Sequence, residues 1–292
     1  QKIMLPIVCA LCGKKQKIHI LYPATFSPAQ ISKDIYSARR MPDRIHYRIV
    51  CCQRCGLIFS SPIFPPKKIA NWYRQSSCTY SSQVPYLVAT YLKLYGDAKS
   101  LLPPSPRVLE IGCGNGYFLE ALRDNGIPDV YGVEPGRDMV GKAAPRLRDR
   151  IIVDVFKKHQ FPGSSFDLIC CFHTLDHVIN PLELVKISFS LLKRGGVMIV
   201  VTHDTQGLSV KLLGERSPIF DIEHIYLFNK KTIAELFKRA TFTVWKVHNL
   251  VNTYPLSYWI RMSGLGLNIS RLPIDPPISL SGGNLVAVAQ TP

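Results

Sequence analysis

Four cysteines near the N-terminus have the type and spacing of a zinc site. Cys9 and Cys12 form one C-x-x-C pair, Cys52 and Cys55 form a second, and a glycine follows each pair. Two such pairs supply four thiolates to one tetrahedral Zn²⁺. The set predicts a closed structural site, because a catalytic zinc keeps an open position and commonly has a histidine or carboxylate ligand. The alternative is that these are reduced cysteines in a core. Cys51 fits less well, because its spacing to Cys55 is too long.

A second set of residues indicates a small-molecule site. The segment VLEIGCGNGYFLEAL, residues 108–122, contains Gly112, Gly114 and Gly116 between a strand pattern and a helix pattern. Glycines at such a turn let a ligand approach the backbone at the end of the strand. A dinucleotide site would have the spacing G-x-G-x-x-G, and here the third glycine comes one position early. Glu134 ends the next expected strand, about 20 residues further on, where a carboxylate can bind ribose hydroxyls.

Two histidines follow the fourth expected strand, in the segment CFHTLDHV. His173 and His177 are candidate general bases, because the pKa of imidazole suits proton transfer near neutral pH. The alternative for His177 is a structural role, either capping the next helix or packing in the core.

The elements that must position these residues alternate between strand and helix patterns from residue 107 onward. Expected strands are RVLEI, DVYGV, RIIV, FDLICCF, GVMIVVT, FTVWKV and NLVAVAQ. Expected helices are GYFLEALRDNG, GRDMVGKAAPRL, NPLELVKISFSLLKRGG and FNKKTIAELFKRA, with Asn180 placed to cap the third. This alternation predicts a doubly wound, mostly parallel α/β sheet.

The chain divides into three expected parts. Residues 1–65 form a small zinc-ribbon-like module, residues 66–104 a helical linker, and residues 105–292 the main ligand-binding domain. An aromatic and apolar insertion at 250–283 separates the last two strands of that domain. We expect it to be a lid or a dimer surface. The alternative is an interfacial element, in which residues 250–280 make peripheral contact with a membrane and a lipid-linked substrate.

Composition sets further limits. The 292 residues are 47% hydrophobic, enough for a full core. Residues 1–100 carry 15 lysines and arginines against three acidic residues, whereas the rest is nearly balanced. This basic third predicts an anionic partner, which is nucleic acid, a phosphorylated substrate or an acidic surface, unless it is only a solvated face. Because no segment has the length of a membrane-spanning helix, we expect a cytoplasmic protein.

These motifs, in this order, resemble the class I S-adenosylmethionine-dependent methyltransferases. The pieces that carry the resemblance are VLEIGCGNGYFLEAL, VYGVEPGRDM, FPGSSFDLICCFHTLDHVINP and LLKRGGVMIVV. The cysteine segment, with its C-G-L-I-F-S-S-P end, resembles the zinc-binding segment of a bacterial subset of the family. The resemblance implies a seven-stranded Rossmann-like sheet in which GGNLVAVAQ is the reversed strand.

The resemblance also implies S-adenosylmethionine and structural Zn²⁺ as cofactors, and it assigns roles to residues. It places Glu110, Gly112, Gly114 and Gly116 around the methionine end of the cofactor. Glu134 holds the ribose and Asp154 meets the adenine. Phe172 stacks near the adenine or closes the methyl pocket.

A further resemblance concerns a second metal. His173, Asp176, His177 and His224 resemble the E-x-x-E-H plus histidine cluster of certain Mg²⁺-dependent methyltransferases. Here a histidine stands in the first position instead of glutamate. The additional nitrogen would favour a transition metal over Mg²⁺.

We therefore expect methyl transfer to oxygen or carbon of a small biosynthetic intermediate, a sugar or nucleotide-linked sugar. An anionic small-molecule substrate would explain the basic N-terminal third. One alternative is an RNA methyltransferase whose zinc module grips phosphates, although no aromatic-basic platform for single strands stands out. The other is a non-catalytic binding module, against which the intact glycine loop argues. The sequence leaves the acceptor atom and the oligomeric state open.

Overall fold

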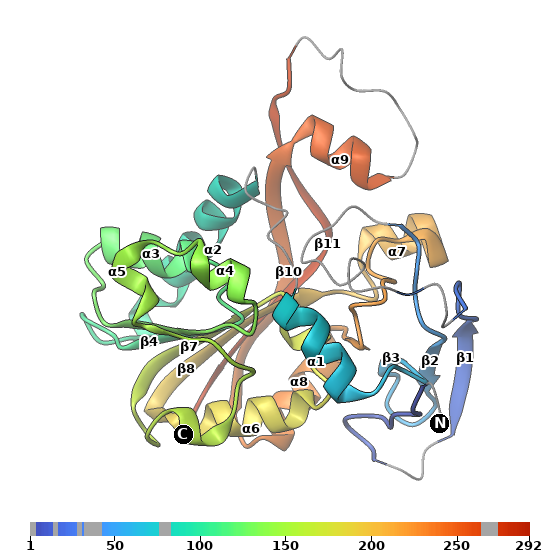
Figure 1. Ribbon diagram of the computed structural model, residues 1–292, viewed down its shortest axis with the longest axis horizontal. Helices are drawn as coiled ribbons and strands as arrows, with labels where there is room; N and C mark the ends of the chain where they lie inside the picture. The colour runs from blue at the N-terminus through green and yellow to red at the C-terminus, as the bar shows by residue number, and fades with distance from the viewer. Residues whose placement is uncertain (1–3, 14–16, 28–30, 32–42, 76–82, 264–273) are drawn as a thin grey trace.

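The computed structural model describes residues 4–13, 17–27, 31, 43–75, 83–263 and 274–292. Its main element is a seven-stranded sheet with strand order β10-β11-β8-β7-β4-β5-β6 (Figure 1). The strands are β4 (Val108–Ile111), β5 (Val130–Val133), β6 (Ile151–Ile152), β7 (Phe166–Phe172), β8 (Leu192–His203), β10 (Thr243–Pro255) and β11 (Pro277–Gln290). Neighbours from β6 to β8 pair in parallel, and β11 is antiparallel to both β8 and β10. The predicted mostly parallel sheet with one reversed strand is confirmed.

Helices cover both faces of this sheet. One layer contains α2 (Val84–Ala98), α3 (Tyr117–Asp124), α4 (Arg137–Gly141) and α5 (Pro145–Arg148), and the other contains α6 (Pro181–Leu191) and α8 (Lys230–Arg239) (Figure 1). Val108 of β4 packs in the cluster with α2 and α3, whereas its neighbour Leu109 packs in the cluster with α6 and α8. Successive residues of a strand point to opposite faces, so strands covered on both sides read as continuous apolar runs.

The local sequence signals define most element ends. The side chain of Asn180 accepts a hydrogen bond from the backbone N–H of Glu183 at 3.2 Å, which confirms the expected cap of α6. This helix ends at Leu191, earlier than expected, because the next residues already belong to β8. The helix expected over 136–147 is two short helices, with Pro145 at the start of the second.

A second, four-stranded sheet has the order β1-β2-β3-β9. Its strands are β1 (Ile18–Tyr22), β2 (Ile49–Cys52), β3 (Ile58–Ser60) and β9 (Tyr226–Leu227). The last of these comes from the region after β8, and Ile58 pairs with Leu227 in antiparallel register. The hydroxyl of Tyr226 also donates to the Val8 carbonyl at 2.7 Å. The boundary predicted at residue 65 stays a prediction, but the sheet of the N-terminal module includes a strand of the main domain.

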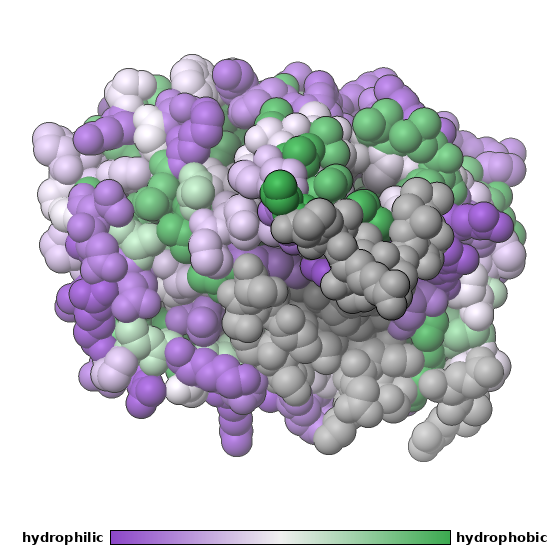
Figure 2. Space-filling model, turned by 90° about the horizontal axis from the view of Figure 1, so that it is seen from above, coloured by the Kyte–Doolittle hydropathy of each residue, from purple (hydrophilic) through white to green (hydrophobic). Residues whose placement is uncertain are grey.

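The two last strands continue beyond the main sheet as a projecting hairpin, seen at the top of Figure 1. We call residues 250–263 and 274–283 the arm; it includes α9 (Leu256–Ser263). The indole Nε1 of Trp259 donates to the Ile278 carbonyl at 2.9 Å, which ties α9 to the hairpin. On the face seen from above, hydrophobic residues gather in the upper right part of the view, and hydrophilic residues lie beside them (Figure 2). Among the described helices, none is long and apolar enough to cross a membrane.

Candidate active site

A cavity of about 740 Å³ lies where β4, β5, β7 and β8 end. Its walls combine the glycine loop, four histidines and the aromatic side chains of the arm. These lining residues include Gly112, Gly114, Glu134, Phe172, His173, His177, His203, His224, Tyr254, Tyr258 and Trp259. Ligands of open α/β sheets bind outside the carboxyl ends of the strands, and this volume is typical of a ligand pocket.

The glycine loop leaves β4 with its backbone in the left-handed region. Gly112, Gly114 and Gly116 have φ values of 75°, 57° and 75°. A Cβ atom on Gly112 would lie 2.1 Å from Oγ1 of Thr174, so this position has no space for a side chain. Gly116 begins α3 as its N-terminal cap and is not part of the cavity wall.

Glu134 connects this loop to the end of β5. Its carboxylate accepts hydrogen bonds from the backbone N–H of Gly114 at 3.0 Å and of Gly136 at 2.7 Å. Burial raises the pKa of Glu134, and the two hydrogen bonds oppose that rise. Because the side chain lines the cavity while it fixes the loop, its predicted contact with a ribose stays a prediction that the placement allows.

Glu110 lies in β4, two residues before Gly112, and is not part of the cavity wall. It is 2% exposed, and its Oε2 atom has no hydrogen-bond partner among the described residues. Burial and the charge of Glu134 raise the pKa of Glu110 well above its usual range. The fold therefore favours the protonated form of this side chain.

Replacing Glu110 with glutamine should make the unliganded protein less sensitive to alkaline pH. The stability that a raised folded-state pKa contributes is present below the unfolded pKa of about 4.3 and is lost as pH rises through the folded value. We expect Glu110→Gln to be more stable than wild type by about 1–3 kcal/mol at pH 8, with a smaller difference at pH 5. Urea unfolding at both pH values measures this. The exposed Asp149→Asn is the control, and an unchanged pH slope in Glu110→Gln would contradict the assignment.

The structure separates the two remaining residues of the predicted cofactor set. Phe172 borders the cavity, and its ring stacks on Tyr91 with 4.0 Å between the ring centroids. Asp154 is not on the described wall. Its carboxylate pairs with Lys157 and lies 3.5 Å from Nη2 of Arg74, and the hydrogen bond from Lys157 lowers its pKa. The adenine contact predicted for Asp154 remains untested.

Histidines from three segments meet at the cavity wall. His173 and His177 follow β7, His203 ends β8, and His224 precedes β9. The ring centroids of His203 and His224 are 4.3 Å apart, those of His177 and His224 5.0 Å, and those of His173 and His203 5.3 Å. The hydroxyl of Tyr73, on α1 (Pro66–Gln75), lies 2.8 Å from Nδ1 of His177.

A buried carboxylate lies at the centre of these histidines. Asp176 is fully buried, and its Oδ2 atom lies 2.5 Å from Nδ1 of His203. Burial alone would raise the pKa of Asp176, but the charge and hydrogen bond of His203 hold it well below its usual range. Burial and the charge of His203 lower the pKa of His224, which favours the neutral ring.

Sequence reasoning missed His203 and Tyr73. A polar residue that ends the buried run VMIVVTH was a signal for His203, because β8 lies beside β7 and its end meets the loop that carries His173. For Tyr73 no local pattern was available, since it reaches His177 across 104 positions of sequence.

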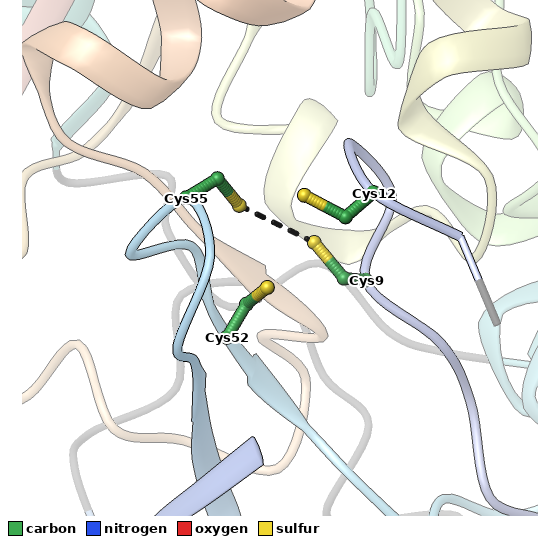
Figure 3. A group of neighbouring side chains, drawn as sticks. All are labelled: Cys9, Cys12, Cys52 and Cys55. Atoms are coloured by element: carbon green, nitrogen blue, oxygen red, sulfur yellow. Dashed lines mark hydrogen bonds between the residues drawn. The ribbon is translucent and has the colours of Figure 1, made fainter. Parts of the chain in front are cut away.

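The four predicted zinc ligands converge (Figure 3). The Sγ atoms of Cys9, Cys12, Cys52 and Cys55 all lie within 4.8 Å of one another, and those of Cys9 and Cys55 are 3.5 Å apart. Each pair forms a tight turn, in which Gly13 donates to the Cys9 carbonyl at 2.9 Å and Gly56 to the Cys52 carbonyl at 2.8 Å. Burial and the nearby Cys55 raise the pKa of the Cys12 thiol to about 11.

A model of the methyltransferase domain matches residues 80–247, more than half of the sequence. The chain belongs to the class I S-adenosylmethionine-dependent methyltransferases. Two solved structures of that kind share its fold. One is an S-adenosylmethionine-dependent methyltransferase from Archaeoglobus fulgidus, with 16% identity, a TM-score of 0.51, and coverage of 73% of this chain and 99% of that one. The other is a putative methyltransferase from Bacillus halodurans, with 15% identity, a TM-score of 0.50, and coverage of 70% and 98%.

Curated relatives match this methyltransferase over a shorter segment. The ubiquinone biosynthesis O-methyltransferase of Psychrobacter arcticus is 30% identical over 104 residues, which are 33% of this chain and 40% of the relative. The protein of the same name from Xanthomonas campestris is 31% identical over 107 residues, which are 34% and 44%. The chain therefore spans less than half the length of these relatives.

Membership of the family gives Gly112 a testable role at the cofactor. In Gly112→Ala, the left-handed backbone costs about 1–2 kcal/mol, and the overlap with Thr174 adds a similar amount. We expect S-adenosylmethionine to bind at least about tenfold more weakly, since this strain displaces the loop. Isothermal titration of each variant measures the affinity.

The matched control for this change is Gly141→Ala. Gly141 lies in α4, where an added Cβ meets nothing within 4 Å. It should bind S-adenosylmethionine as wild type does. Equal affinities of Gly112→Ala and wild type would show that the loop does not contact the cofactor.

Proposed function

We propose that this methyltransferase transfers the methyl group of S-adenosylmethionine to a hydroxyl oxygen of a small, largely apolar molecule. One observation carries the proposal: the glycine loop, the histidine cluster and apolar aromatic walls line a single cavity of about 740 Å³. Such a volume holds a cofactor and a small acceptor together. The curated relatives are named as O-methyltransferases, which supports oxygen as the acceptor atom.

The charges of the cavity wall favour a neutral acceptor. Its described lining contains the acidic side chains of Glu134, Glu183, Asp221 and Glu223, and within that lining there is no lysine or arginine. A nucleotide diphosphate needs cationic partners, so this wall does not favour the nucleotide-linked sugar that the sequence led us to expect. The aromatic rings of Tyr254, Tyr258 and Trp259 suit a phenolic or otherwise apolar acceptor.

The residues present fit the cofactor and the proton transfer. Gly112 and Gly114 offer the cavity a backbone without side chains, and Glu134 lies beside them. S-adenosylmethionine, when bound, supplies an electrophilic methyl group. A hydroxyl acceptor must lose a proton, and His203 is placed to accept it. In its neutral form, with Nδ1 donating to the buried Asp176, His203 carries the lone pair on Nε2, as in the histidine of a catalytic triad. His173 and His177 stay predicted bases.

Radiolabelled S-adenosylmethionine tests the proposal. The full chain is incubated with methyl-labelled cofactor and, separately, with an alkyl-substituted catechol, a nucleoside diphosphate sugar and bulk RNA. We expect label in the catechol as an alkali-stable methyl ether, and background label in the other two. Label confined to the nucleotide sugar or to nuclease-sensitive RNA would overturn the proposal. The Gly112→Ala variant is the negative control.

The cysteine cluster fits one structural Zn²⁺, which we include in the proposal. Four thiols within 4.8 Å of one another, each pair closed by a glycine turn, form the donor set of a tetrahedral zinc site. Metal binding deprotonates its thiol ligands, so zinc would offset the burial that raises the pKa of the Cys9 and Cys12 thiols.

The remaining expectations about partners stay predictions. Contact with a membrane through residues 250–280 is supported by the exposure of Val251 and Leu280 on the arm and of Leu208 and Leu212 on α7 (Leu208–Leu213). The basic N-terminal third keeps RNA as a possible anionic partner. The panel above includes RNA for this reason.

A further inference from the structure

Three side chains at the cavity wall have the arrangement of a metal site. Asp176 and His177 lie in a short 3₁₀ turn after β7, and His224 lies in the segment before β9. One ligand atom from each of the three lies within 4.8 Å of the other two. His173, which the sequence placed in this group, lies outside it. The donors are thus two imidazoles and one carboxylate.

The carboxylate of Asp176 has one oxygen that the protein does not satisfy. Its Oδ2 atom accepts from His203, whereas Oδ1 accepts no hydrogen bond from the part of the chain that the structure describes. Oδ1 lies 3.7 Å from Nε2 of His177, and the side chain is fully buried. A buried charged oxygen without a partner destabilises the fold more than a buried neutral oxygen without a partner does. A cation beside Oδ1 would remove that cost.

The imidazole of His224 has its proton on the side away from the cluster. Its Nδ1 atom lies 2.7 Å from the carbonyl of Ile219, and a carbonyl only accepts, so Nδ1 carries the hydrogen. The lone pair is therefore on Nε2. Metal-binding histidines characteristically donate their other ring N–H to a carbonyl or carboxylate in this way. The other two side chains are held in a similar way, Asp176 by His203 and His177 by the hydroxyl of Tyr73.

We propose that Asp176, His177 and His224 bind one divalent transition-metal ion, with its open positions facing the cavity. Two histidines and one carboxylate are the ligands of catalytic Zn²⁺ and of related Fe²⁺ sites, and nitrogen donors disfavour Mg²⁺. This inference rests on the proposed function. An ion held there would bind the acceptor hydroxyl and lower its pKa, and His203 would accept the proton that the hydroxyl loses. It selects acceptors whose oxygen can reach the metal, such as catechols and other vicinal diols.

Cobalt binding tests this site without relying on activity. The full chain is treated with a mild chelator, titrated with Co²⁺, and its metal content is measured by mass spectrometry. Thiolate ligation gives sulfur-to-cobalt charge-transfer absorption, whereas a nitrogen and oxygen site gives only ligand-field bands, so the two sites are read separately. We expect wild type to bind two equivalents of Co²⁺. One fills the cysteine site and gives charge-transfer absorption, and the other gives ligand-field bands alone.

Two variants remove ligands, and one matched variant does not. Asp176→Asn and His224→Gln should each lower the Co²⁺ affinity of the nitrogen and oxygen site at least about 100-fold. Replacing a residue that only contacts a metal ligand already lowers metal affinity about 10- to 100-fold. The exposed His159→Gln should bind as wild type does. Retained charge-transfer absorption shows that each variant is folded. Equal uptake by wild type and both ligand variants would overturn the site. Methyl transfer by wild type that lacks the metal at Asp176, His177 and His224 would also overturn the proposed site. Metal binding there without methyl transfer would count against the proposed function alone.

Discussion

Replacing His203 with glutamine should slow methyl transfer about 10²- to 10⁴-fold, the usual contribution of a general base. The affinity for S-adenosylmethionine should change by less than about twofold, because the ring of His203 contacts Asp176, His173 and His224, whereas the glycine loop is fixed by Glu134. Glutamine keeps a donor for Asp176 but has no basic nitrogen. Single-turnover transfer of labelled methyl to the acceptor, together with cofactor titration, separates the chemical step from binding.

His173→Gln is the comparison that decides between the histidines. His173 lines the same cavity, and its backbone N–H donates to the carbonyl of Val201 at 2.8 Å, whereas His203 is the histidine whose ring bonds Oδ2 of Asp176. If His173→Gln slows transfer more than His203→Gln does, the base is His173 and the Asp176–His203 pair is structural. If cofactor affinity falls with transfer in His203→Gln, the variant has disturbed the fold and the assignment fails.

The double variant Cys9→Ser/Cys52→Ser should lose one metal ion per chain and unfold the N-terminal sheet. Apparent binding energies of structural zinc are about 10–16 kcal/mol in small zinc modules, which is as large as the whole stability of many domains. We expect thermal unfolding to shift down by more than about 10 °C, or to lose its cooperativity. Differential scanning calorimetry and metal analysis of the purified chain measure both effects.

Cys51→Ser is the matched control for this variant. Cys51 is adjacent to Cys52 in β2, but its sulfur is not part of the four-thiol group. It should keep the metal and the melting temperature of wild type. Metal loss in Cys51→Ser, or full metal content in the double variant, would refute the ligand set Cys9, Cys12, Cys52 and Cys55.

Features that depend on neighbours in sequence were predictable. The Asn180 cap, the glycine loop and the turn at each cysteine pair each need only a few consecutive residues. The sheet and its reversed strand followed from alternating patterns together with the family resemblance. The convergence of two distant cysteine pairs was predictable because one tetrahedral ion requires it.

Features that join distant segments were not predictable. No pattern in residues 226–227 shows that these two residues complete the N-terminal sheet, and a two-residue strand has no periodicity. The contact of Asp176 with His203 and that of His177 with Tyr73 depend on how β7, β8 and α1 pack. The resemblance assigned Asp154 to the adenine, but it could not show that Lys157 and Arg74 lie beside the Asp154 carboxylate.

The strand β9 has a consequence for how this enzyme can be divided. Ser60, in β3, donates its hydroxyl to the carbonyl of His224 at 2.8 Å, and the N–H of Ile225 donates to the carbonyl of Asp176 at 2.7 Å. The N-terminal module therefore forms part of the scaffold of the histidine cluster. A truncated version limited to residues 80–247 would keep the family's signature and lose Ser60 and Tyr73. The module is thus not separable from the main domain, and exchanging it between homologous proteins would also exchange part of the scaffold that holds His224.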